Sequence, residues 1–416
     1  MKTVSKARPS FVAALLVALA FALGFAEFVL IGITPDVAEG LGEPLTLIGD
    51  IVGYYALACA VATPVVALAT ARANRFKLTA VLLVVFNAGN LLTLFADGYA
   101  LLLMSRLLPA ATSGTLLAIA LTYVPEIVDV GKVARVLSFV LAGFSVSSVV
   151  GVPIGTALAD AFGWKAAYAC VLVLGLVVSA LLLPALPRKA RAAHETTTLR
   201  SQLRLLGDRR VLANIAMILA GAASTYVFYT YLTPVLEDVM GFGGGAVSVI
   251  LFALGAACVV SNLLSGWVAN RFGMRALPLT FALHAALLAL LAVTVPLGAA
   301  GLADIACVCL LMYVMNSTVQ MLFQDVARRD YPSALTFSSS LHPMSFNAGI
   351  ALGSFAGGVV VNAGGLLATG PIGALFALVA AVLALVLVRL TAQDREESTT
   401  TERLSNKLED RFKESA

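Results

Sequence analysis

Two residues of opposite charge lie where the sequence predicts the interior of a membrane. Glu27 is the one charged residue of the apolar stretch 11–34, and Arg106 is the one base in the interior of any predicted span. A carboxylate at the bilayer centre costs about 2.5–3.5 kcal/mol on insertion scales, so such a residue usually has a function and a partner. At 1.5 Å per residue, both lie about 10 Å inside the same end of their spans. The two residues therefore form either an ion pair that locks two helices or a gate for protons and substrate.

We favour the gate, because the pKa of a buried carboxylate responds to its surroundings. Burial raises this pKa and a nearby arginine lowers it. Opening a cavity to one side of the membrane changes the balance, so we predict that Glu27 is a protonatable switch and Arg106 its counter-charge. Asp50, near the start of the second span, is either a solvated helix cap or a second site of protonation or substrate recruitment.

In the second half of the chain the polar residues form stripes instead of charged pairs. They recur at helical spacing from Tyr313 to Gln324 in the tenth predicted span and from Ser338 to Ser345 in the eleventh. Inside a membrane such side chains either join helices by hydrogen bonds or line a cavity, and their clustering favours the cavity. The predicted substrate-contacting residues are Glu27, Asn90, Ser113, Tyr226, Tyr229, Tyr313, Asn316, Gln320, His342 and Asn347.

Glycine and proline mark places where the predicted helices approach closely or bend. Gly143, Gly151, Pro153 and Gly155 fall in the fifth predicted span, where small residues allow close packing and proline removes a backbone donor. Pro343, directly after His342, predicts a break in the eleventh span.

The composition allows only one class of protein. Of 416 residues, 60% are hydrophobic and 12% charged, which predicts an integral membrane protein. The apolar runs are about 20 residues long without strand alternation, so we expect helices and no barrel. The five cysteines fall in apolar runs, without metal-ligand spacing, and are expected to be small buried residues. We expect no metal, no cofactor and no nucleotide-binding loop.

The elements that position these residues are twelve predicted spans in an all-α membrane fold. The basic residues before the first span allow a signal peptide, but the apolar run is too long and favours an uncleaved helix. The predicted ranges are 11–33, 48–71, 78–96, 99–123, 136–159, 165–187, 211–235, 246–268, 276–297, 303–325, 334–362 and 368–390.

Charge distribution predicts the orientation. With the N-terminus in the cytoplasm, 25 of the 27 Lys and Arg residues fall in cytoplasmic segments, as the positive-inside rule requires. Both termini are then cytoplasmic. The net charge of +4 is explained by this orientation in the membrane and does not indicate binding of nucleic acid. The predicted units are a terminus at 1–10, six-helix bundles at 11–187 and 211–390, a cytoplasmic linker at 188–210, and a tail at 391–416 that is either a surface helix or disordered.

One tetrapeptide recurs at matching positions of the two halves. Ala-Asn-Arg-Phe occupies 73–76 after the second span and 269–272 after the eighth. A repeat of six helices predicts a substrate site between the halves, near the midplane.

These features together resemble the major facilitator superfamily. The segment 266–275 resembles the superfamily loop motif through Gly266, Asn270, Arg271 and Gly273. The first copy keeps Asn74 and Arg75, but Thr70 and Lys77 replace its glycines. The resemblance implies a role of this loop in gating, less securely in the first half.

Other segments are similar to the twelve-helix drug/proton antiporter branch, nearest to bacterial sugar, arabinose, nucleoside and chloramphenicol efflux-like proteins. Arg106 in LLLMSRLLPAATSGTLLA matches a basic motif tied to proton coupling, and Gly143 to Gly155 resemble an exporter motif. The resemblance implies a monomer in the bacterial inner membrane, in contact with lipid, that exports a small solute against protons. Lys165 and His342 depart from the expected arginine and polar amide, and the second change bears on substrate choice.

Two other functions stay open. Uptake by proton symport or uniport is opposed only by the exporter motif, and a membrane sensor without transport would need a larger cytoplasmic partner-binding region. We do not expect an enzyme.

Overall fold

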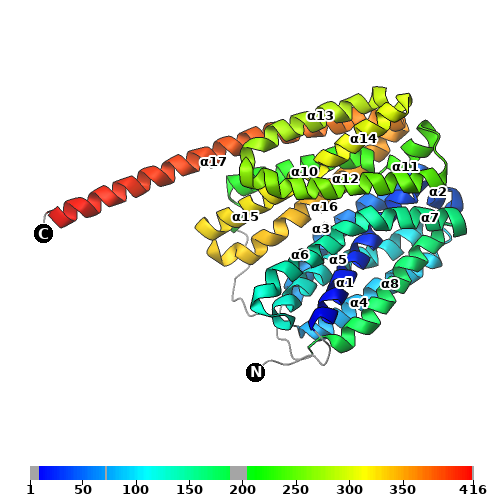
Figure 1. Cartoon of the computed structure of the whole chain (residues 1–416), viewed down its shortest axis with the longest axis horizontal. Helices are drawn as coiled ribbons and strands as arrows, with labels where there is room; N and C mark the ends of the chain where they lie inside the picture. The colour runs from blue at the N-terminus through cyan, green and yellow to red at the C-terminus, as the bar shows by residue number, and fades with distance from the viewer. Residues whose placement is uncertain (1–8, 71–72, 188–203, 415–416) are drawn as a thin grey trace.

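A computed structural model describes residues 9–70, 73–187 and 204–414. The described residues are helical with short connections and contain no strand. Twelve helices or helix pairs are long and apolar enough to cross a membrane, which confirms the predicted all-α fold and number of spans (Figure 1).

The first six spans are built from eight helices and one π-helical segment. They are α1 (Pro9–Gly32), α2 (Thr34–Leu41), α3 (Leu45–Ala69), α4 (Arg75–Leu94), α5 (Tyr99–Ile127), α6 (Val133–Val146), the π-helical η2 (Ser147–Gly151), α7 (Val152–Phe162) and α8 (Trp164–Ala185), with a short turn η1 (Val130–Lys132) before α6.

The last six spans contain more interruptions. They are α10 (Arg209–Tyr229), α11 (Leu232–Pro234), the π-helical η3 (Val235–Val239), α12 (Gly244–Arg271), α13 (Leu277–Thr294), α14 (Ala299–Met312), α15 (Asn316–Asp330), α16 (Leu335–Gly364) and α17 (Thr369–Glu414), with short turns η4 (Gly273–Ala276), η5 (Val295–Leu297), η6 (Pro332–Ala334) and η7 (Leu366–Ala368).

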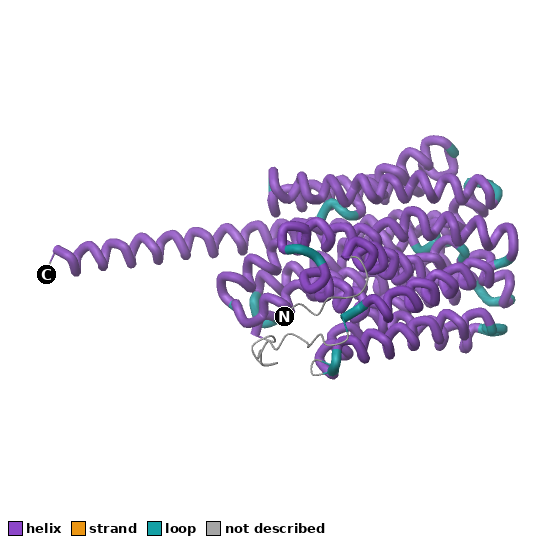
Figure 2. Tube along the Cα trace, turned by 60° about the horizontal axis from the view of Figure 1, so that its bottom comes forward, coloured by secondary structure: helices purple, strands orange, loops and turns teal. Residues whose placement is uncertain are grey.

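The bundle has two ends, which we name by what lies there. At the tail end α1 and α10 begin, and α17 continues past the bundle as a projecting helix (Figures 1 and 2). At the opposite α2 end lie α2 and α11. The predicted domain boundaries stay predictions, since most of the linker at 188–210 lies outside the described residues.

The tenth span is broken, and this corrects the prediction of one continuous polar stripe. Between α14 and α15 the chain turns at Tyr313 to Met315. Two serines of α12 stabilise the turn, because Ser261 accepts the backbone N–H of Tyr313 at 2.9 Å and Ser265 accepts that of Ser317 at 2.7 Å. These hydroxyls replace carbonyl acceptors of a regular helix.

Two further expectations about helix ends are wrong. The predicted break at Pro343 is absent, since α16 is continuous from Leu335 to Gly364. Asp50 caps no helix, because α3 begins at Leu45 and places Asp50 in its second turn. In the fifth span the regular helix is interrupted by the π-helical η2, which ends two residues before Pro153.

The two halves meet along two pairs of helices. In one pair α3 packs against α16, and in the other α7 and η2 pack against α12. Glycines allow close approach at both: a methyl group at Gly53 would lie 2.7 Å from the Phe355 ring, and one at Gly255 would lie 2.6 Å from Cα of Val149.

Candidate functional site

Arg106 is a fully buried cation near the middle of the first half. Only 1% of it is exposed. One guanidinium nitrogen donates to Asn90 Oδ1 at 3.0 Å, and the other donates to the backbone carbonyl of Ala26. The guanidinium also lies 5.1 Å from the Tyr55 ring centroid and 4.8 Å from that of Tyr168. Hydrogen bonds and aromatic faces therefore compensate the buried charge.

Glu27 follows directly after Ala26, so its carboxylate belongs to the same turn of α1 that Arg106 contacts. It is 9% exposed. Among the described residues no hydrogen bond or ion pair holds this carboxylate, so the ion pair with Arg106, the less favoured of the two alternatives, is not formed. Its charge is nevertheless within interaction range of Arg106, and of Tyr226 in the other half. Glu27 is thus buried without a fixed hydrogen-bond partner among the described residues.

The position of α1 follows from its sequence. Its apolar residues continue around the whole helix, and every residue from Ala22 to Gly32 is buried. The predicted small face of the fifth span packs against it: a methyl group at Gly143 would lie 2.7 Å from the Val17 carbonyl, and one at Gly155 would lie 2.5 Å from Val29. These contacts fix the helix that carries Glu27.

Aromatic side chains form the facing wall in the second half. Phe346 of α16 is at the centre, with ring centroids 6.2 Å from Tyr226, 6.0 Å from Tyr313 and 6.0 Å from His342. Tyr229 adds a ring 5.6 Å from Tyr226. The break between α14 and α15 places Tyr313 in this group.

Several buried polar atoms of this wall have no hydrogen-bond partner in the described part of the chain. They are Tyr226 Oη, Asn316 Oδ1, His342 Nε2 and Asn347 Oδ1. Burying such atoms unpaired is unfavourable, so they are available to a polar ligand.

Several of the predicted substrate-contacting residues lie beside Arg106 in the first half, and others lie around Phe346 in the second. Asn90 contacts Arg106, and Ser113 lies 3.2 Å from the Tyr55 hydroxyl. Asn316 donates to Asn262 at 3.2 Å, and Gln320 is half-buried one turn further along α15.

Sequence reasoning missed five contributors. Tyr55, Tyr168 and Phe346 lie in apolar spans and carry no charge that marks them, although a tyrosine deep in a span is a polar group that needs a partner. Ser261 and Ser265 are four residues apart on α12, and this spacing on one helix face was a usable signal.

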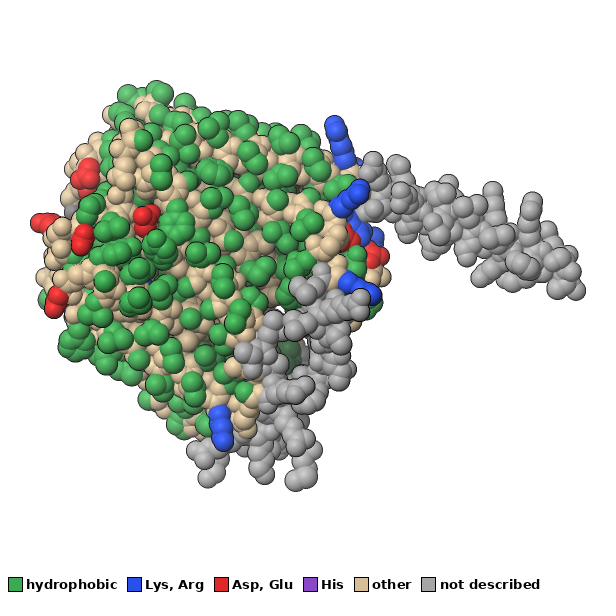
Figure 3. All heavy atoms as spheres, turned by 180° about the vertical axis from the view of Figure 1, so that it is seen from behind, with side chains coloured by type: hydrophobic (Ala, Val, Ile, Leu, Met, Phe, Trp, Pro, Cys, Tyr) green, Lys and Arg blue, Asp and Glu red, His purple; other side chains and the backbone are tan. Residues whose placement is uncertain are grey.

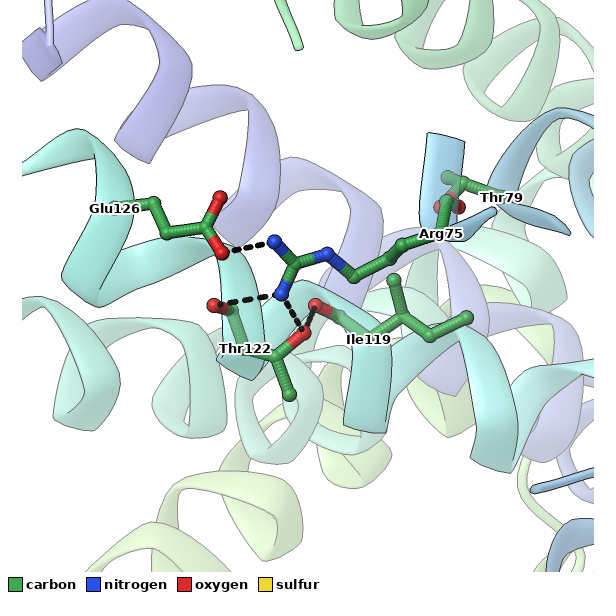
Figure 4. Close-up of polar contacts among 5 residues, drawn as sticks. All are labelled: Arg75, Thr79, Ile119, Thr122 and Glu126. Atoms are coloured by element: carbon green, nitrogen blue, oxygen red, sulfur yellow. Dashed lines mark hydrogen bonds and ion pairs between the residues drawn. The ribbon is translucent and has the colours of Figure 1, made fainter. Parts of the chain in front are cut away.

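The two copies of the loop motif differ in structure. Asn74 caps α4 by accepting the backbone N–H of Lys77 at 3.1 Å. Arg75 is buried, forms an ion pair with Glu126, and donates to Thr122 Oγ1 at 3.2 Å (Figure 4). It thereby ties α4 to the end of α5.

In the second copy Asn270 and Arg271 are exposed at the end of α12, and the space beside Gly266 is open. Gly273 has φ +56°, a left-handed conformation that favours glycine and explains this motif position. Among the described residues the motif therefore makes side-chain contacts in its first copy, where it is more degraded, and its role in gating stays a prediction.

Comparisons with known proteins identify the family. The sequence profile of the Major Facilitator Superfamily matches residues 16–342. The chain is 34% identical over 382 residues to the MFS-type transporter YtbD of Bacillus subtilis (strain 168), covering 91% of this chain and 96% of the relative. It is 27% identical over 379 residues to the inner membrane transport protein YdhP of Escherichia coli (strain K12), covering 91% and 95%. The chain belongs to the Major Facilitator Superfamily.

Solved structures show the same fold at low sequence identity. A bacterial homologue of the human lysosomal transporter Spinster, in an inward-facing and occupied conformation, matches with a TM-score of 0.78 at 14% identity over 92% of this chain and 98% of that one. A D-xylose–proton symporter matches with a TM-score of 0.70 at 13% identity over 91% and 97%.

The family defines the chain as a multi-pass membrane transporter and not an enzyme. Its members carry small molecules and work as single chains. In the described residues no group of His, Cys, Asp and Glu side chains is arranged to hold a metal.

Proposed function

We propose that this transporter exports a small polar or amphipathic solute in exchange for protons, with Glu27 as the protonatable switch. The observation that carries this is the contrast between two buried charges. Arg106 is held by Asn90, the Ala26 carbonyl and two aromatic rings, whereas the Glu27 carboxylate has no hydrogen bond in the described residues. A fixed cation beside an unconstrained carboxylate is suited to stabilise Glu27 when ionised and release it when protonated.

Alternating access gives this pair its role. When the cavity is open to the side of low proton concentration, water and Arg106 favour the ionised carboxylate. Closing the cavity around ionised Glu27 removes its hydration, so closure requires either a proton or a positively charged or hydrogen-bonding solute. Because the proton and the solute occupy the site in turn, the movement of one is coupled to the movement of the other.

The facing wall of the second half supplies the chemistry for a solute. Tyr226, Tyr229 and Phe346 offer apolar ring faces, while Asn316 and Asn347 offer unpaired carbonyl oxygens. Such a site accepts a ring with hydroxyl or amino groups, which supports a sugar, a nucleoside or an amphenicol-type drug as substrate.

The orientation follows from charge. On the face drawn in Figure 3, Lys and Arg gather at the tail end and most Asp and Glu at the α2 end. With the tail end in the cytoplasm of a bacterial cell, this distribution obeys the positive-inside rule. Hydrogen bonds cross between the halves at the α2 end, from Thr46 to Asn362 and from Thr233 to the Ile31 carbonyl, which supports a state closed to the outside.

The test uses proteoliposomes of known protein orientation with a trapped pH dye. Sugars, nucleosides and amphenicols are added one class at a time under an imposed pH gradient. Proton movement opposite in direction to one solute class, absent from empty liposomes, supports antiport and names the class. Movement of proton and solute in the same direction would establish symport and refute export.

A further inference from the structure

The α2 end of the interface is closed by successive contacts between α3 and α16. At the outermost contact Thr46 donates to Asn362 at 3.1 Å. Two turns inward the Tyr54 ring lies 4.9 Å from the Phe355 ring. Asp50 lies between these two contacts on α3, one turn from Thr46, and Gly358 lies between them on α16, one turn from Asn362.

A tyrosine from the seventh span lies at the same level as Asp50 and Gly358. Tyr231 follows the end of α10, where the helix is interrupted before α11. It is fully buried, and its hydroxyl has no hydrogen-bond partner among the residues that the structure describes. A side chain without a hydroxyl would suit this buried position better, unless the Tyr231 hydroxyl forms a hydrogen bond in some state of the protein.

Glycines make room for this tyrosine. A methyl group at Gly49 would lie 2.5 Å from the Tyr231 hydroxyl, and one at Gly357 would lie 2.8 Å from its ring. A methyl group at Gly358 would lie 2.9 Å from Asp50 Oδ1 and 3.1 Å from Tyr231 Oη. The carboxylate and the hydroxyl therefore approach the same point, one from each half of the transporter.

We propose that Asp50 and Tyr231 form a latch that holds the α2 end of the transporter closed, with Tyr231 donating a hydrogen bond to the Asp50 carboxylate. Both oxygens face the position of the missing side chain at Gly358, so no side chain of that residue separates them. Opening the α2 end separates α3 from the seventh span and breaks the contact. Glu27 has no part in the latch, so the inference does not depend on proton antiport.

The test measures how often the α2 end is closed. Spin labels are attached at Phe162→Cys and Leu297→Cys, which are exposed at the α2 end of the two halves, with Cys170 and Cys307 replaced by Ser. Double electron–electron resonance in lipid nanodiscs then gives the ratio of short to long distances. Asp50→Ala and Tyr231→Phe should each lower this ratio about tenfold, the usual worth of a hydrogen bond to a charged group.

The double variant distinguishes a latch from two separate packing effects. Asp50→Ala with Tyr231→Phe should lower the ratio no further than either change alone, because both remove the same bond. Asp50→Asn keeps an acceptor oxygen but loses the charge, so it should lower the ratio by less than Asp50→Ala does. Effects of the single changes that multiply in the double variant would overturn the proposal, as would single variants that match the wild type.

Two more variants guard against a folding defect. Gly358→Ala fills the space where the oxygens meet and should also lower the closed fraction, whereas Gly245→Ala, with open space around it, should not. Equal effects of these two would contradict the latch. Proton-coupled transport lost in Glu27→Gln with an unchanged distance ratio would leave the latch intact, so the two proposals fail separately.

Discussion

Replacing Arg106 by lysine tests whether the geometry of the guanidinium, beyond its charge, holds the site together. Lysine keeps the charge but offers one ammonium group, which cannot reach Asn90 and the Ala26 carbonyl while stacking between two rings. Losing one hydrogen bond to a charged group costs about 1.5–3 kcal/mol, and weaker stacking on the two rings adds about 0.5–1 kcal/mol. We expect a loss of about 2–4 kcal/mol and a melting temperature lower by roughly 3–8 °C.

The assay is thermal unfolding in detergent, followed by intrinsic fluorescence at one pH and lipid concentration. Asn90→Ala should lower stability by less than Arg106→Lys does. The double variant should lose less stability than the sum of the two single losses, because the two residues share a hydrogen bond. Lys165→Met is the matched control, since this exposed base pairs with exposed Asp97 at 3.1 Å, and such a pair contributes about 0–1 kcal/mol. Arg106→Lys as stable as the wild type would refute the reasoning.

Three further predictions concern packing, the tail end and pH. Gly24→Ala should lower stability by about 1–3 kcal/mol, because its methyl group would meet Ser147 and lie 2.8 Å from the Phe144 carbonyl; Gly131→Ala, in open space, should have no effect in the same melting assay. Glu126→Gln should cost about 1–2 kcal/mol by leaving buried Arg75 without its ion-pair partner, and an equal melting temperature would show that Thr122 and Tyr123 suffice. Burial, with the charge of Asp160 adding to it, raises the pKa of Asp36 to about 6. Ionised Asp36 therefore destabilises the fold. The free energy of unfolding of Asp36→Asn should equal that of the wild type below about pH 4 and exceed it increasingly up to about pH 6. At higher pH the difference should stay at about 1 kcal/mol, a value reduced because Asp36 is partly hydrated. A difference largest at pH 4 would contradict this sign.

The number and order of the spans could be predicted from the sequence, because hydrophobic length alone determines them. Glu27 and Arg106 stood out for the same reason, as charges cost most where everything else is apolar. Their actual contacts could not be predicted, since the Ala26 carbonyl and the rings of Tyr55 and Tyr168 reach Arg106 only through the packing of separate helices.

Helix breaks were the least predictable feature. Pro343 predicted a break that α16 does not have, whereas Tyr313 to Met315 form a break that no proline marks. In the tenth span the outcome depends on which partners the backbone finds, because Ser261 and Ser265 provide acceptors for the interrupted helix. Such side-chain contacts between distant segments leave little trace in local sequence.

The most direct test of the proposed coupling compares two activities of Glu27→Gln in the same proteoliposomes, once a transported solute is known. Exchange of labelled for unlabelled solute requires the cavity to alternate but no net proton movement, whereas uphill transport driven by a pH gradient requires the switch. The account predicts that Glu27→Gln retains exchange and loses uphill transport, with Glu43→Gln as an acid-to-amide control that keeps both. Uphill transport by Glu27→Gln at the wild-type rate would contradict it.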